Sequence, residues 1–124
     1  SESTVQDITV SGGTLDINGT SPNFGTVTVS SGTISGSGTI YAKAYNLTPV
    51  AGGVATITST ITDYNSSNRA IVTQTGQGLA VVSNASNSFT AGIVLQGGIY
   101  SPGSLAALSS TTAGGNSGKI TFQV

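Results

Sequence analysis

The charged side chains of this sequence come together in only one place where they could do chemistry. Asp63 is followed directly by Tyr64 and lies close to Arg69, and such a group of residues can bind or act on a sugar. Asp7 and Asp16 are too far apart to share a local motif suited to paired acid–base catalysis. The spacing favours an Asp63–Arg69 pair that fixes a loop, and it predicts that the chain is not an enzyme.

The composition excludes several further classes of function. Histidine and cysteine are absent, so the usual transition-metal ligands, Cys–His nucleophiles and Ser–His–Asp triads are missing, and nothing predicts a cofactor. A net charge of −1 with three cationic residues offers no surface that neutralises phosphates, which excludes nucleic acid as a partner. No apolar run approaches the roughly 20 residues of a membrane helix, so no membrane span is expected.

Threonines and aromatic residues are the remaining candidates for a binding surface. Ranks of outward threonines can bind ice or crystalline polysaccharide if a Thr-x-Thr pair returns in every structural repeat. The pairs here gather mostly between residues 56 and 75, which favours ordinary exposed threonine: Thr26/Thr28, Thr56/Thr58, Thr58/Thr60, Thr60/Thr62 and Thr73/Thr75. The four tyrosines and three phenylalanines are scattered, which favours packing over a sugar-binding platform.

Asparagine followed two residues later by Ser or Thr, the acceptor sequence for N-linked glycans, occurs at four positions. A chain this rich in Asn, Ser and Thr produces such triplets by chance, so the sequence alone selects none of them. They begin at Asn18, Asn46, Asn65 and Asn84.

The elements that carry these residues are expected to be short β-strands. Apolar and polar residues alternate with a period of two, which places one side chain inward and the next outward along a strand. The segments lie at residues 8–10, 15–17, 27–29, 57–61 and 120–124. No window sustains the period of a helix, and the aliphatic residues are mostly the β-branched Val and Ile. The sequence predicts an all-β fold.

Glycine followed closely by an aliphatic residue recurs along the chain at a nearly regular interval of roughly 20 residues. The members of this series are Gly13, Gly32, Gly53, Gly78, Gly98 and Gly118. Their spacing fits one coil of a β-solenoid better than the shorter strand spacing of a sandwich. We therefore predict a parallel β-helix of about six coils, with these glycines at its corners, where positive φ angles are needed.

Asparagines at a similar separation suggest a second stacked feature. Asn84 and Asn87 follow Asn65 and Asn68 by about one coil, and amide side chains at matching corners can form a ladder. The role predicted for these four residues is structural.

Residues 75–99 resemble the autotransporter-associated β-strand repeat of secreted bacterial surface proteins. The resemblance is carried by Thr75-Gly76-Gln77-Gly78, Asn87-Ser88-Phe89 and Gly92-Ile93-Val94, with Phe89 where the family usually has Tyr. It implies a right-handed parallel β-helix, export, and display at the cell surface for adhesion or scaffolding. Residues 10–19 and 31–40 are similar to the looser coils that flank such repeats.

Three functions are compatible with these observations. The preferred one is a single solenoid domain over residues 1–124 that acts as a non-enzymatic structural or adhesive module, extracellular or on a bacterial surface. Its bare terminal strands, at residues 4–10 and 119–124, indicate either a slice of a longer solenoid or ends that pair with other copies, and we predict head-to-tail stacking into a fibre. The alternatives are a pilin-like antiparallel β-sandwich that donates residues 3–11 to the next subunit, and a β-helix that binds or acts on surface glycans.

Overall fold

The computed structural model describes residues 6–65, 67–84, 87–102 and 120–122, and over these residues it contains strands and turns but no helix. All pairings between strands are parallel, and the strands form one ten-stranded sheet. The predicted all-β parallel fold is confirmed, and the antiparallel sandwich is excluded. The strands are β1 (Ile8–Asp16), β2 (Asn23–Ser35), β3 (Thr39–Leu47), β4 (Val54–Ile57), β5 (Thr60–Asp63), β6 (Ile71–Gln74), β7 (Leu79–Val82), β8 (Ile93–Leu95), β9 (Ile99–Pro102) and β10 (Ile120–Phe122).

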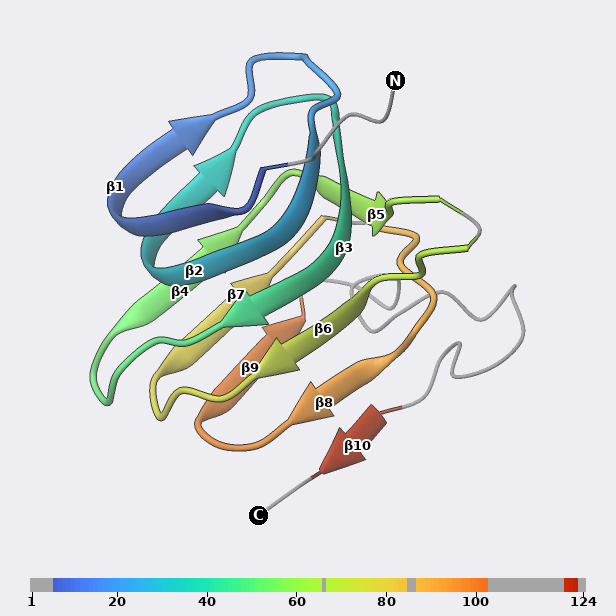
Figure 1. Cartoon of the computed structure of the whole chain (residues 1–124). Coiled ribbons are helices and arrows are strands. Elements are labelled where there is room, and N and C mark those ends of the chain that lie inside the picture. The colour runs from blue at the N-terminus through green and yellow to red at the C-terminus, as the bar shows by residue number, and fades with distance from the viewer. Residues whose placement is uncertain (1–5, 66, 85–86, 103–119, 123–124) are drawn as a thin grey trace.

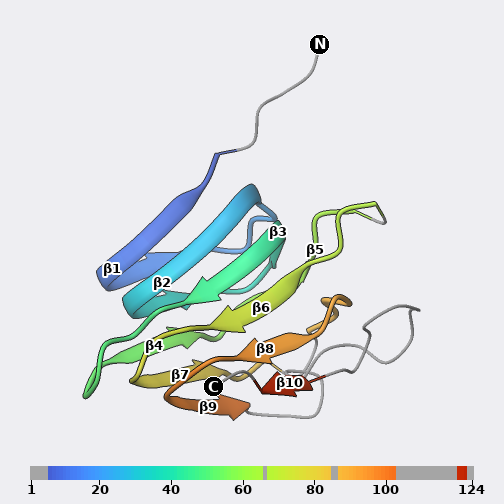
Figure 2. The same ribbon diagram turned by 60° about the horizontal axis from the view of Figure 1, so that its bottom comes forward.

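The sheet winds around itself as a solenoid with three faces (Figure 1). The first face consists of the start of β1, the middle of β2, the end of β3, and then β6, β8 and β10. The second face consists of the ends of β1 and β2 followed by β4, β7 and β9. The third face is shorter and combines the starts of β2 and β3 with β5. Successive coils lie on top of one another (Figure 2).

The described residues complete about four coils, fewer than the six predicted from the glycine spacing. Along the first face the chain returns to the same position at Ile8, Val27, Tyr45, Val72 and Ile93, and these returns are unevenly spaced. The coil between Tyr45 and Val72 is the longest because it contains two inserted connections, residues 48–53 and 64–70. The four coils from Ile8 to Ile93 nevertheless average about 21 residues, the interval that the glycines predict, and the count of six extended this interval over residues that the structure does not describe.

The core lies between the three faces and is made of columns of aliphatic side chains. Alternate residues of each strand point inward, and the parallel register places similar side chains on top of one another from coil to coil. Val27, Val72 and Ile93 of the first face, and Ile34 and Ile57 of the second, are all fully buried or nearly so. The β-branched composition suits this arrangement because such side chains pack well on a pleated surface.

Tyr45 lies in one of these inward columns, stacked between Val27 and Val72. Its ring is fully buried, and its hydroxyl oxygen lies 2.7 Å from the carbonyl oxygen of Thr62 and 2.9 Å from that of Ile40. Removal from water raises the pKa of the Tyr45 hydroxyl well above its ordinary value, so the group stays protonated. Tyr45 therefore links the first face to the third across the core.

Candidate functional site

The outer surface of the first face carries two columns of polar side chains. In the first column, register pairs place Thr9, Thr28, Asn46 and Thr73 in successive coils, and Val94 ends the run. A second column lies two residues further along each strand. It contains Ser30, Thr48, Thr75 and Gln96, because the backbone bonds Thr48 N to Val29 O, Thr75 N to Leu47 O and Gln96 N to Gln74 O continue the same register. We call these eight polar residues the hydroxyl face.

The geometry of the hydroxyl face follows from the parallel sheet beneath it. Neighbouring strands are about 4.8 Å apart, and residues two positions apart along a strand are separated by roughly 6.6 Å. Every member is exposed or half-buried, and none is charged. The surface is thus a regular, neutral array of hydroxyl and amide groups, which is suited to hydrogen bonding with a ligand that is itself repetitive.

The sequence did not reveal this array because its coils differ in length. Thr-x-Thr pairs were expected to return at a constant interval, whereas the coils of the first face are of unequal length. Pairs that bunch together in the sequence separate in the structure: Thr56 lies on the second face, Thr60 and Thr62 on the third, and Thr73 on the first. Because the coils differ in length, the residues of the hydroxyl face do not recur at a constant interval in the sequence.

The second face carries a shorter polar column that serves as an internal comparison. Thr14, Thr33 and Thr56 are register partners in three successive coils, and Val81 interrupts the column in the fourth. A second polar column lies two residues further along, because the backbone bonds Thr58 N to Ile34 O and Ser83 N to Ile57 O continue the register of Asp16 with Ser35. The second face therefore differs from the hydroxyl face by the charged Asp16 and by the interruption at Val81, and not by its width.

Asp63, the acidic candidate from the sequence, is engaged in structural hydrogen bonds. One carboxylate oxygen accepts from the backbone N–H of Ala70 (2.7 Å) and of Thr90 (2.9 Å), and the other accepts from the Thr90 hydroxyl (2.5 Å). The carboxylate thus closes the connection between β5 and β6 and ties it to the following coil. The sequence predicts a loop-fixing Asp63–Arg69 pair. The hydrogen bonds to Ala70 and Thr90 give Asp63 such a role, and its pairing with Arg69 stays a prediction.

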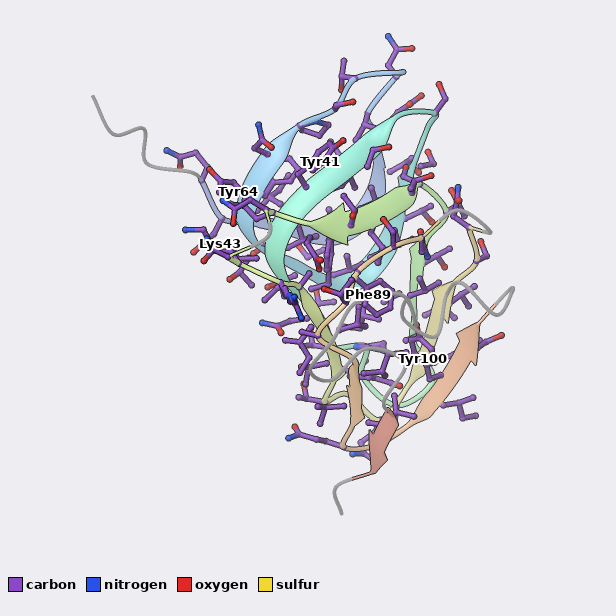
Figure 3. The ribbon with its side chains drawn as sticks, turned by 90° about the vertical axis from the view of Figure 1, so that its right-hand side faces the viewer. Tyr41, Lys43, Tyr64, Phe89 and Tyr100 are labelled. Atoms are coloured by element: carbon purple, nitrogen blue, oxygen red, sulfur yellow. The ribbon has the colours of Figure 1, made fainter. Side chains whose placement is uncertain are left out.

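The aromatic residues divide into an outer and an inner group (Figure 3). Tyr41 is 37% exposed, and the ammonium group of Lys43 lies 5.1 Å from the centre of the Tyr64 ring, within the range of a cation–π contact. Phe89 is fully buried, and burial raises the pKa of the Tyr100 hydroxyl well above its ordinary value. The exposed Tyr41 and Lys43 and the half-buried Tyr64 form a second surface cluster, at the third face.

Five of the six predicted corner glycines lie at the same corner, where the first face turns into the second. Gly13, Gly32 and Gly98 have φ angles of 73°, 86° and 68°. Gly53 and Gly78 lie directly before β4 and β7 without a positive φ, and Gly78 is packed against the backbone of the preceding coil. The sixth, Gly118, lies outside the described residues.

The four asparagines do not form the predicted ladder, because the two pairs lie at different corners. Asn84 donates its side-chain N–H to Thr58 O (3.0 Å), and Asn87 accepts from Ile61 N–H (2.9 Å), each from one coil to the next. Asn65 and Asn68 instead bond each other within the connection that follows β5 (3.1 Å). The assumption of a constant coil length caused the error.

The described part of the chain contains no candidate metal site and no membrane-spanning helix, and the sequence matches no known protein or family. Over the described part of the chain, no three acidic, histidine or cysteine residues gather to hold a metal ion, and no helix is long and apolar enough to cross a bilayer. No protein-family model matches the sequence, and neither the curated proteins nor the solved structures contain a match to it. The resemblance to the autotransporter repeat therefore stays a prediction that rests on residues 75–99.

Proposed function

We propose that this chain is a non-enzymatic structural and adhesive module of an extracellular or bacterial cell-surface protein. In this proposal the solenoid supplies a stiff support, and the hydroxyl face contacts a repetitive polar ligand such as an insoluble polysaccharide. The observation that carries the proposal is the register that aligns outward polar pairs over successive coils of the first face. The low number of charged residues also suits a surface exposed to varied salt and pH.

The hydrogen bonds of Asp63 and the burial of Tyr45 favour a binding function over a catalytic one. A general acid or base must be free to exchange a proton with its substrate, whereas the carboxylate of Asp63 accepts three hydrogen bonds from its own chain. The hydroxyl of Tyr45 is buried and stays protonated. Asp63 and Tyr45 thus stabilise the fold in this proposal, and the ligand meets only neutral polar groups.

Replacement of Thr28, Thr73 and Thr75 together by valine is expected to weaken binding to insoluble polysaccharide at least tenfold. Valine keeps the branched shape and suits a strand, but it removes three hydroxyls, each able to contribute about 0.5–1.5 kcal/mol. The measurement is co-sedimentation of the purified chain with cellulose, chitin and other crystalline glycans over a range of glycan concentrations. The triple variant Thr14→Val, Thr33→Val and Thr56→Val, on the second face, is the matched control and should bind as the unmodified chain does.

Equal losses in the two triple variants, or no binding of the unmodified chain to any of these solids, would count against the hydroxyl face as an adhesive surface. Replacement of Tyr41 and Tyr64 by serine tests the cluster at the third face in the same assay. Loss of binding in that variant alone would move the adhesive surface to the third face.

We also propose that copies of the chain associate head to tail through the strands at the two ends of the solenoid. Among the described residues, β1 pairs only with β2, β9 only with β7, and β10 only with β8. Each end thus presents one strand of the first face and one of the second, so parallel strand addition between copies is geometrically consistent.

Head-to-tail association through these ends is expected to raise the mean mass in light scattering as concentration rises. Thr9→Pro removes a backbone N–H from β1 and should reduce association if that edge is the contact. A matched change to proline at the exposed Val50, in the connection between β3 and β4, leaves β1 intact. A monomer at all concentrations would refute the proposal.

A further inference from the structure

The four N-glycan acceptor sequences differ in the structure by the backbone conformation and the hydrogen bonds of their asparagines, which the sequence alone does not show. We propose that Asn18 is the residue of the folded chain to which an N-linked glycan is attached.

Asn18 lies at the tip of a tight turn between β1 and β2. The connection between these two strands is near the top of Figure 1. Its φ angle is 51° and that of Gly19 is 75°, and Thr20 N–H donates to Ile17 O (3.0 Å), as in a type I′ turn. The backbone N–H of Asn18 donates to the carboxylate of Asp16 (2.8 Å), but no hydrogen bond engages its side-chain amide within the described residues. The side-chain amide of Asn18 is therefore exposed and can enter the active site of a glycosyltransferase.

Small residues surround the turn and leave room for an enzyme and its product. The next coil passes beneath the turn as Gly36-Ser37-Gly38, and Gly19 N–H donates to Ser37 O (2.8 Å). The nearest neighbour that a side chain at Gly19 would meet is the Ser37 hydroxyl, at 3.5 Å. No bulky side chain of this coil therefore shields Asn18.

The other three acceptor asparagines are held in ways that oppose transfer. Asn46 lies in the middle of β3, between its register partners Thr28 and Thr73, where the backbone cannot bend into a transferase. The side-chain oxygen of Asn65 accepts from Ser67 N–H (2.9 Å), Asn68 N–H (2.8 Å) and the Asn68 amide (3.1 Å).

Asn84 is held through the nitrogen that would become glycosylated. Its side-chain N–H donates to Thr58 O (3.0 Å) in the coil above. Modification of Asn65 or Asn84 would therefore require hydrogen bonds of the acceptor amide itself to break first.

The reaction joins the side-chain nitrogen of Asn18 to the anomeric carbon of a sugar supplied by a glycosyl diphosphate donor. The bond between that carbon and the phosphate oxygen breaks, the oxygen keeps the electron pair, and the nitrogen loses one proton. The transferase must hold the amide of Asn18 and the hydroxyl of Thr20 at the same time, because both belong to the acceptor sequence. The Thr20 hydroxyl donates to Ile17 O (2.6 Å) in the folded chain, so the transferase must replace this bond, whereas the side-chain amide of Asn18 has no bond within the described residues to replace.

The test is to incubate the purified folded chain with an N-glycosyltransferase specific for Asn-x-Ser/Thr and with its glycosyl diphosphate donor. Intact mass and peptide mapping should show one glycan, with occupancy at Asn18 at least tenfold above that at Asn46, Asn65 or Asn84. Thr20→Ala should abolish this product, whereas Thr20→Ser, which keeps the hydroxyl, should retain it. The same reaction on the urea-denatured chain, after dilution to a tolerated urea concentration, should modify further asparagines.

Greater occupancy at Asn65 or Asn84 than at Asn18 in the folded chain would overturn the proposal. Acceptance at Asn18 only after denaturation would also overturn it, because the folded turn would then not be the acceptor. Circular dichroism of each Thr20 variant before the reaction shows whether loss of the product reflects the missing hydroxyl or a missing fold.

Discussion

Replacement of Tyr45 by alanine is expected to lower the free energy of unfolding by about 5 kcal/mol. The change removes the largest fully buried side chain of the core and leaves a cavity between Val27 and Val72. It also removes the hydroxyl that contacts the carbonyls of Ile40 and Thr62, which then stay buried without this partner. Urea denaturation followed by circular dichroism measures the loss.

Tyr45→Phe separates the two contributions of this residue. It keeps the ring that fills the core and removes only the hydroxyl, so we expect a loss of about 1–3 kcal/mol. Hydrogen exchange should report faster exchange at Thr62, whose N–H lies 3.3 Å from the Tyr45 hydroxyl. Equal stability of the alanine variant and the unmodified chain would show that the coils do not stack around Tyr45 as described.

Gly78→Ala is expected to lower the free energy of unfolding by about 3 kcal/mol or more, the second largest effect after that of Tyr45→Ala. A Cβ at position 78 would lie 3.0 Å from the Pro49 Cβ and closer still to the carbonyl oxygens of Val50 and Gly53. These oxygens belong to the backbone of the preceding coil, so the clash cannot be relieved by rotation of a side chain. We expect β7 and β9 to lose protection first in hydrogen exchange.

Gly13→Ala is the matched control at the same corner of the solenoid. Gly13 has a φ of 73°, and a Cβ there would meet nothing within 4 Å. Gly13→Ala should therefore lower the free energy of unfolding only through the positive φ that alanine must adopt, by about 1–2 kcal/mol. If the two alanine variants lost equal stability, crowding between coils would not be the reason for glycine at position 78.

The fold class was predictable because it depends on features that single residues carry. Alternating Val, Ile and Thr specify strands, and the recurrence of glycine specifies stacked coils with a common corner. The length of each single coil was less predictable than the mean interval. The connections 48–53 and 64–70 lengthen the coil between Tyr45 and Val72, and the glycine series does not show which connections carry the extra residues.

The candidate site was less predictable than the fold because it depends on register. Thr28 and Thr73 lie on one face only because a short coil before Asn46 and a long coil after it both return the chain to the same register. The same uneven lengths separate Asn65 from Asn84, which a constant spacing had placed in one ladder. The hydrogen bonds of Asp63 to Ala70 and Thr90 likewise depend on which corner the longer coil occupies.

The connection of residues 64–70 shows how this architecture tolerates changes in chain length. Residues 39–42 of β3 pair with β5 before this connection, and residues 44–47 of β3 pair with β6 after it. The extra chain leaves both pairings parallel, because it projects from the corner between them. Asp63 and the Asn65–Asn68 bridge close the base of the segment, so its length is independent of the strands that follow. Evolution or protein engineering can therefore graft a foreign peptide at this position and display it on an otherwise unaltered scaffold.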